Sequence, residues 1–296
     1  MRTDQRLTQA YESARVVPLD ATSRFVFLSD CHRGDGSLSD DFTRNQNIYL
    51  HALECYFEQG YVYVEVGDGD ELWEHDIRHI KNAHYQVYET IRKFATAERF
   101  ILIWGNHNVQ ISRRQYVEKN YYTYFDAHTQ ESTDFLRGVE PCEAIILRDA
   151  GTGWEALVLH GHQGDFLNDQ AWFLTMLSVK YFWRFLHAFG IRNPASPVKN
   201  VPKRHKIEKN YNRWIARHKR PLICGHTHRF KYPRSDEPPY FNTGNCIYPT
   251  SISAIEIVDG VIQLVRWQVR VNREGVLQVE RDVLTGPEPL GMFVID

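Results

Sequence analysis

The sequence has no long apolar run, no CxxC motif and no strong excess of charge of either sign. Its 296 residues include five cysteines, an odd number, which favours a reducing compartment over a disulfide framework. No stretch reaches the ~18 consecutive apolar residues of a membrane-spanning helix. Residues 1–15 are charged and lack the apolar core of a signal peptide. We therefore expect a cytoplasmic protein without a transmembrane helix.

The charge balance argues against a protein devoted to nucleic acid. Lys and Arg number 35 and Asp and Glu number 37, which gives a net charge of −2 and leaves room only for a local basic patch. The composition, with 43% hydrophobic and 24% charged residues, is that of an ordinary globular protein. We expect one domain over 1–296. The 14 histidines stand out, because histidine is the commonest metal ligand.

The first third of the chain alternates between strand and helix patterns. Short apolar runs at 24–29, 61–66 and 100–104 predict buried strands. Between them, 44–59 predicts a helix that ends at a glycine, and 76–98 has the spacing of three and four that is typical of an amphipathic helix. This alternation indicates an α/β fold with parallel strands.

The rest of the chain is richer in hairpins. Apolar runs at 143–148 and 155–159 flank a glycine-rich turn, and 222–224 predicts a short strand. Two long strand patterns, 251–258 and 261–271, are joined by an Asp-Gly turn and followed by a further strand. The C-terminal part therefore predicts antiparallel strands without helices.

Five of the predicted strands are followed by the same kinds of polar residue. Each is followed within a few residues by Asp, Asn or His, mostly beside a glycine. In α/β sheets the carboxyl ends of strands are where ligands gather, so these side chains can converge from distant parts of the chain. The candidates are Asp30, His32, Asp68, Asn106, His160, His226 and His228.

The residue types indicate a transition-metal site. Carboxylate, imidazole and amide oxygen together suit Mn, Fe or Zn better than Ca or Mg, which favour shells of oxygen alone. Seven ligands are too many for one ion. A carboxylate can bridge two cations about 3.5–4 Å apart, so the set predicts a pair of metal ions.

The order DxH … GD … GNH … HGH … GHTH, over residues 30–228, resembles the calcineurin-like metallophosphoesterases. The resemblance implies a four-layer α/β/β/α sandwich with two mixed sheets and a dinuclear metal site. It assigns the first ion to Asp30, His32, Asp68 and His228. It assigns the second ion to Asp68, Asn106, His160 and His226, with Asp68 as the bridge. His107 would be the general acid.

The activity implied by the resemblance is hydrolysis of a phosphate ester or pyrophosphate bond by a metal-bridging hydroxide. The expected cofactors are two divalent cations, Mn first and Fe or Zn as alternatives. The expected partner is a small phosphorylated molecule. The competing functions are a nuclease or a phosphodiesterase for nucleic acid or cyclic nucleotides, and a non-catalytic scaffold of the same fold.

Several positions in these motifs have rivals. His162 competes with His160, and Asp70 competes with Asp68; we favour His160 because the family uses the first histidine, and Asp68 because it lies nearer the strand end. Cys31 lies between two ligands and is expected to pack inward. Arg33, directly after His32, is a candidate phosphate-binding residue.

One position departs from the family pattern. Asn108 stands where the family usually has an acid that orients the histidine of GNH. An amide can accept a hydrogen bond from His107, but it supplies no negative charge. We therefore expect a substitute acid near His107, with Asp70 and Glu71 as candidates.

The long segment 166–220 predicts a helical cap inserted into the domain. Its first part, 166–193, is rich in aromatics, and 199–220 carries nine Lys and Arg against one acid. Together with the sequence from Asp68 to Trp73, GDxx[DE]xW in type, it resembles the branch that includes UDP-2,3-diacylglucosamine hydrolases. That branch implies a sugar-nucleotide or lipid-linked substrate. The segment can also lie against an anionic membrane, or simply pack on the core with a solvated basic face.

Overall fold

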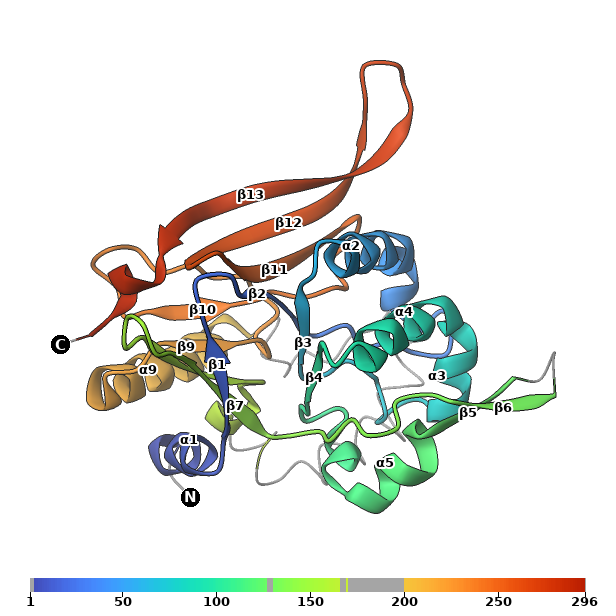
Figure 1. The fold of residues 1–296 in the computed structure, drawn as a ribbon, viewed down its shortest axis with the longest axis horizontal. Coiled ribbons are helices and arrows are strands. Elements are labelled where there is room, and N and C mark those ends of the chain that lie inside the picture. The colour runs from blue at the N-terminus through green and yellow to red at the C-terminus, as the bar shows by residue number, and fades with distance from the viewer. Residues whose placement is uncertain (1–2, 127–129, 166–168, 170–199, 296) are drawn as a thin grey trace.

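Two β-sheets face each other at the centre of the molecule (Figure 1). The computed structural model describes residues 3–126, 130–165, 169 and 200–295. The order of the six-stranded sheet is β13 (Leu277–Pro289), β12 (Val261–Val271), β11 (Ser251–Val258), β2 (Arg24–Leu28), β3 (Val62–Val66) and β4 (Phe100–Ile103). The order of the five-stranded sheet is β1 (Arg15–Leu19), β7 (Ala144–Asp149), β8 (Glu155–Leu159), β9 (Leu222–Cys224) and β10 (Tyr240–Asn242).

Both sheets are mixed, as the sequence predicted. Strands β2, β3 and β4 run parallel, and β11 and β12 join β2 as an antiparallel pair. In the second sheet β7 and β8 form the predicted hairpin, while β1, β9 and β10 add parallel neighbours. A separate hairpin of β5 (Thr123–Asp126) and β6 (Glu131–Asp134) projects from the body. No pattern in the sequence predicted this hairpin.

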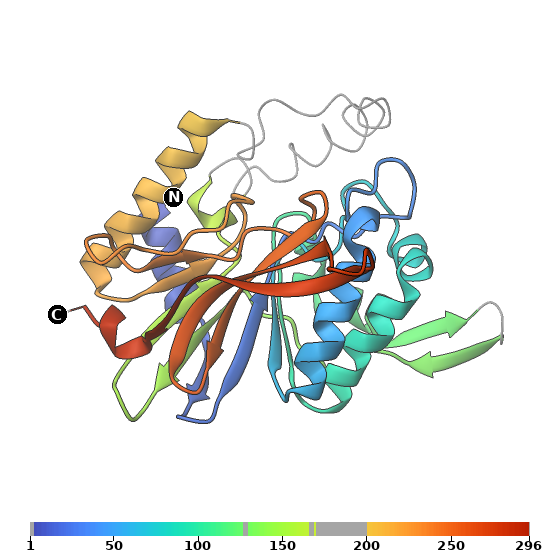
Figure 2. The ribbon, with the colours of Figure 1, turned by 90° about the horizontal axis from the view of Figure 1, so that it is seen from above.

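Helices cover the outer face of each sheet, which gives four layers. The helices of the described residues are α1 (Thr3–Glu12), α2 (Gln46–Glu58), α3 (Ile77–Ala83), α4 (Tyr85–Thr96), α5 (Arg114–Tyr121) and α9 (Val201–His218). One apolar cluster lies between the two sheets, a second between the six-stranded sheet and α2 and α4, and a third between the five-stranded sheet and α1 and α9. Figure 2 shows α1 and α9 on one side of the paired sheets and α2 and α4 on the other. The predicted α/β/β/α sandwich is confirmed.

The single helix predicted over 76–98 is wrong. It is divided into α3 and α4 at His84, whose backbone leaves the helical region at φ −117° and ψ 32°. The buried imidazole donates or accepts at both nitrogens, with Asp40 at 2.7 Å and Gln46 at 2.8 Å. These partners lie about forty positions earlier in the chain, so the apolar periodicity alone could not reveal the break.

The predicted cap can be followed only in part. Residues 166–168 and 170–199 lie outside the described residues. Helix α9, at the end of the segment, buries Tyr211, Trp214 and Ile215 against the outer face of the five-stranded sheet. In the described part of the chain, no helix is long and apolar enough to span a membrane.

Candidate metal centre

The five motif-bearing strands end at one edge of the two sheets. Strands β2, β3 and β4 of one sheet and β8 and β9 of the other each lead directly into a candidate ligand. Backbone hydrogen bonds join these ends: Asp30 N donates to Gly67 O at 3.2 Å, and Gly225 N donates to His160 O at 2.9 Å. Two further bonds join one sheet to the other: His226 N donates to Asp30 Oδ2 and His160 Nδ1 donates to Val66 O, both at 2.9 Å. The ends of both sheets thus meet, as expected for a site built at strand termini.

The first group of converging side chains comprises Asp30, His32 and His228. His228 Nε2 lies 3.1 Å from Asp30 Oδ1, and His32 Nε2 lies 3.2 Å from His228 Nε2. Two imidazole nitrogens and a carboxylate oxygen therefore point at one small volume. Lone pairs this close repel each other unless a proton or a cation lies among them, so the arrangement suits a metal ion.

The second group comprises Asp68, His160 and His226. His160 Nε2 is 3.0 Å from Asp68 Oδ2, and the same oxygen is 3.9 Å from His32 Nε2 of the first group. The other oxygen, Asp68 Oδ1, accepts a hydrogen bond from His107 N at 2.8 Å. One oxygen of Asp68 is thus anchored to backbone while the other lies between the two groups, which is the position that a bridging ligand needs.

Within the described ranges, four of the candidate ligand atoms are buried and form no hydrogen bond of acceptable geometry, although His228 Nε2 lies 3.1 Å from one and Asp68 Oδ2 lies 3.0 Å from another. The four atoms are Asp30 Oδ1, Asn106 Oδ1, His160 Nε2 and His226 Nε2. An orphaned polar atom in the interior costs roughly 1–3 kcal/mol, and native proteins rarely leave several together. Each belongs to a residue that the sequence assigned to a metal. The donor set therefore fits a pair of divalent cations, and the residues that could hold them are clustered as expected.

The backbone at the site is strained in a way that aims these side chains. Asp30, His32, Asp68, His226 and His228 all have positive φ values, between 47° and 66°. Non-glycine residues adopt this region infrequently, at a cost of about 1–3 kcal/mol each, and such residues concentrate at functional sites. The positive φ values thus fall on five of the seven candidate ligand positions.

Glycines allow the closest approaches. A Cβ at position 105 would lie 2.2 Å from Asp68 Oδ1, and one at position 225 would lie 2.4 Å from Asp30 Oδ2. Both distances are shorter than any side chain tolerates, which explains why glycine precedes Asn106 and His226 in the motifs.

The electrostatics keep the carboxylates ionised. Burial raises the pKa of Asp30, but the positive field of His228 and His160 outweighs it and holds that pKa well below its usual value. The pKa of Asp68 is lowered in the same way, against its burial, by His160 and His107. Charged carboxylates in an interior require compensating cations, and divalent metal ions would supply them.

The structure separates the rival positions. His160 donates through Nδ1 to Val66 O at 2.9 Å, which turns its Nε2 toward Asp68, whereas His162 packs beside Trp104 with ring centroids 5.5 Å apart. Asp70 points away from both metal groups and accepts hydrogen bonds from Arg33 and from two tyrosine hydroxyls. Cys31 is fully buried in an apolar cluster, and all five cysteines are free thiols.

His107 is held by an acid from a different loop. Its Nδ1 lies 2.6 Å from the nearer oxygen of Glu71, and its ring stacks on Trp73 with centroids 4.1 Å apart. Glu71 also lies 2.8 Å from His32 Nδ1, so one carboxylate orients two imidazoles. Burial raises the pKa of Glu71, but His107 and His32 lower it to about 2. Glu71 is the substitute acid that the sequence required.

The side chain of Asn108 stabilises the turn after β4. Its Oδ1 accepts a hydrogen bond from Gly105 N at 2.7 Å and closes the turn that carries Asn106. The side chain is buried, and its contacts are with the turn and not with the imidazole of His107. Asn108 therefore shapes the turn, while Glu71 is the acid that meets the imidazole of His107.

Arg33 corrects another prediction. Its guanidinium, only 1% exposed, donates to both oxygens of Glu65 at 2.7 and 2.8 Å and through Nε to Asp70 at 2.7 Å. A phosphate would have to displace two carboxylates to reach it. The residue looked like an anion ligand because its partners lie more than thirty positions away in the sequence. The Arg33 side chain joins β3, through Glu65, to the loop that carries Asp70 and Glu71.

Replacing Arg33 with methionine should therefore destabilise the fold. The change leaves Glu65 and Asp70 as buried charges without a partner, and breaking a buried pair costs about 3–5 kcal/mol. We expect that loss in the free energy of unfolding measured by urea titration at neutral pH. Arg78→Met is the matched control, since the Arg78–Asp76 pair is largely exposed and should contribute little. Equal losses in both variants would contradict the structural role of Arg33.

Two further residues at the site carried no sequence signal. Ser29 donates its hydroxyl to Asp30, and Asp165 lies 3.8 Å from His226 Nε2 and 2.6 Å from Lys203 Nζ. Burial raises the pKa of Asp165, but His226 and Lys203 lower it to about 2. Neither residue belongs to the strand-end motifs. Asp165 does lie three residues after the HGH sequence, but that position alone does not predict a contact with His226.

Comparison with known proteins adds little to this geometry. No protein-family model matches the chain, and no curated protein matches it. Among solved structures, Vacuolar Protein Sorting 29 from Cryptosporidium parvum aligns at 10% identity and a TM-score of 0.38, over 90% of this chain and 100% of its own. Vps29 from Chaetomium thermophilum aligns at 13% identity and a TM-score of 0.35, over 92% and 100%. Likeness at this level carries no argument about function.

Proposed function

We propose that this protein is a phosphoesterase that depends on two divalent metal ions. The observation that carries the proposal is the set of four buried, unpartnered ligand atoms at four converging strand ends. Asp30, His32, Asp68 and His228 would hold one ion. Asp68, Asn106, His160 and His226 would hold the other. Manganese is the metal we expect first, because the set mixes carboxylate, amide oxygen and imidazole; iron and zinc are the alternatives.

The chemistry follows from what each part supplies. Two bound cations would neutralise the charge of a phosphoryl group and lower the pKa of a water molecule beside it. Asp68 Oδ2 lies between the two groups of ligands, so this one carboxylate would link the two metal sites. The strained backbone fixes the ligand atoms before substrate arrives, so little reorganisation is needed.

His107 supplies the proton for the leaving oxygen. Glu71 accepts a hydrogen bond from Nδ1, so Nε2 is the nitrogen left to donate to a substrate. A ring nitrogen of His107 lies within 4.8 Å of the ligand atoms of Asp68 and His32. Trp73 covers one face of the ring and fixes its plane. The Glu71 carboxylate stabilises the imidazolium, which can then donate its Nε2 proton as the ester bond breaks. Such a general acid is worth about 10²–10⁴ in rate.

The experiment is a metal-reconstituted screen. Purified protein is stripped with a chelator, reloaded with Mn, Fe or Zn, and assayed on p-nitrophenyl phosphate, its bis ester, nucleotides, sugar nucleotides and lipid-linked sugar nucleotides. We expect hydrolysis that is lost on stripping and returns with metal. Turnover confined to lipid-linked sugar nucleotides would place the protein in that narrower substrate class. Bound metal below one ion per chain, with no hydrolysis, would instead support a non-catalytic scaffold.

A further inference from the structure

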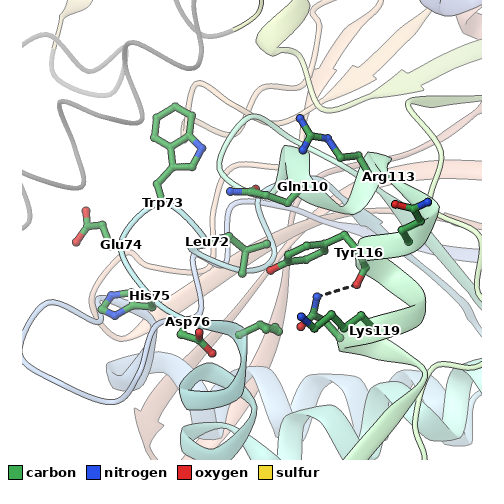
Figure 3. Close-up of a pocket in the computed structure, with 12 residues that line it drawn as sticks. Leu72, Trp73, Glu74, His75, Asp76, Gln110, Arg113, Tyr116 and Lys119 are labelled. Carbon is green, nitrogen blue, oxygen red and sulfur yellow. Dashed lines mark hydrogen bonds between the residues drawn. The ribbon is translucent and has the colours of Figure 1, made fainter.

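A cavity of about 640 Å³ is lined in part by Trp73, the residue whose ring stacks on that of the proposed general acid, His107 (Figure 3). Its walls include Leu72, Trp73, Gln110, Arg113, Tyr116 and Lys119. One side of the cavity is formed by residues 72–73 and by Gln110, and these residues belong to the segments that position His107. Trp73 stacks on the His107 ring, Leu72 N donates to His107 O at 3.2 Å, and Gln110 follows three residues later. The volume is in the range of small-molecule sites in enzymes.

The wall presents polar atoms that nothing in the protein satisfies. Gln110 Oε1 and Trp73 Nε1 are both buried and lack a hydrogen-bond partner among the described residues. Gln110 Oε1 is an acceptor, and Trp73 Nε1 is a donor. A buried polar atom without a partner is costly, so a ligand that supplies a donor and an acceptor fits this wall.

The charges of the cavity are divided between its sides. In Figure 3, Glu74 and Asp76 lie on one side of Leu72, and Arg113 and Lys119 lie on the side of α5. Asp76 already pairs with Arg78 at 3.0 Å. Within the described ranges neither Arg113 nor Lys119 forms an ion pair. The α5 side of the cavity therefore carries two cations without an ion pair among the described residues, and in Figure 3 they lie on either side of Tyr116.

We propose that the cavity binds the leaving-group half of the substrate, and that this half is a flat organic alcohol bearing a second anionic group, a carboxylate or a phosphate, recognised by Arg113 and Lys119. The assignment to the leaving group rests on the proposed function, because a general acid stands on the leaving-group side of the ester. The flat body packs between Leu72 and Tyr116, whose side chains face each other in Figure 3, and the anion reaches the α5 side.

Binding of leaving groups to the full-length, metal-loaded protein tests this directly. The probes are 2-naphthol, 6-hydroxy-2-naphthoate and 6-hydroxynaphthalene-2-phosphonate, measured by calorimetry. We expect the anionic probes to bind about five-fold more tightly than 2-naphthol, the size typical of a partly exposed ion pair. A preference for one of the two anions identifies that anion as the group on the natural substrate. Equal affinity for all three probes would overturn the proposal.

Variants of Arg113, just before α5, and of Lys119 on α5 test which residues cause the preference for anionic probes. Arg113→Ala and Lys119→Ala should each remove most of the preference for the anionic probes. Arg114→Ala is the matched control, because Arg114 is the next residue, is also exposed, pairs with Glu118 and does not line the cavity. A loss as large in Arg114→Ala would show a general charge effect and no site.

Turnover separates this inference from the proposed function. The selectivity of hydrolysis for 6-carboxy-2-naphthyl phosphate over 2-naphthyl phosphate should exceed one and fall toward one in Arg113→Ala. If neither ester is hydrolysed while the binding preference remains, the phosphoesterase assignment fails and the cavity is still an anion-selective site. If both are hydrolysed with equal efficiency and the probes bind equally, the function stands and the cavity inference fails.

Discussion

Asp68→Asn should lower the rate of phosphate-ester hydrolysis by about a thousand-fold or more, because it weakens both halves of the metal centre at once. The Oδ2 atom of Asp68 lies between His160 and His32. An amide at that position has the same shape but carries no negative charge. We expect the bound metal, measured by mass spectrometry after gel filtration, to fall well below two ions per chain.

Asp70→Asn is the control for this change. Asp70 stands two residues from Asp68 and also reads as a candidate ligand, but its carboxylate is bound to Arg33 and two tyrosine hydroxyls. Its loss should lower the free energy of unfolding and leave the metal content near that of the unaltered protein. Loss of metal in Asp70→Asn with retention in Asp68→Asn would reverse the assignment of the bridge.

Glu71→Gln is expected to lower kcat by about a hundred-fold through the orientation of His107. Glu71 meets Nδ1 of both His107 and His32. A glutamine side chain has one acceptor oxygen, so it can serve only one of the two imidazoles well. The effect should be larger for alkyl phosphates, whose leaving oxygen needs a proton, than for p-nitrophenyl phosphate, whose leaving oxygen does not.

That dependence on the leaving group distinguishes a positioning role from general damage. Poorer metal binding through His32 would lower the turnover of both kinds of ester by the same factor. Asn108→Asp is the companion variant: it places the acid of the family pattern at a position whose side chain hydrogen-bonds Gly105 N. We expect no gain in activity from it. A gain equal to the loss in Glu71→Gln would mean that residue 108 is the one that orients His107.

The strands and the clustering of the candidate ligands could be predicted from the sequence because their signals are local. Each of the five strand ends is a short apolar run followed by a polar residue, and both features lie within about eight positions. The same holds for Glu71, which was one of two candidate acids in a single motif. Convergence then followed from a general rule about the carboxyl ends of strands.

The errors concern side chains whose partners lie far along the chain. Arg33 pairs with Glu65 in β3, and His84 breaks a helix by binding Asp40. The periodicity of 76–98 and the position of Arg33 beside a ligand were accurate observations, but burial and partner decide what such residues do. The cavity beside His107 was also hidden, since its walls come from residues 72–77 and 110–120, which meet only in the folded protein.

The most direct test of the account is anomalous X-ray diffraction from a crystal of the manganese-loaded protein. The account predicts two peaks about 3.5–4 Å apart on either side of Asp68, one beside Asp30, His32 and His228 and the other beside Asn106, His160 and His226. A single peak, or none at these side chains after loading, would contradict the claim that the five strand ends form a dinuclear metal centre.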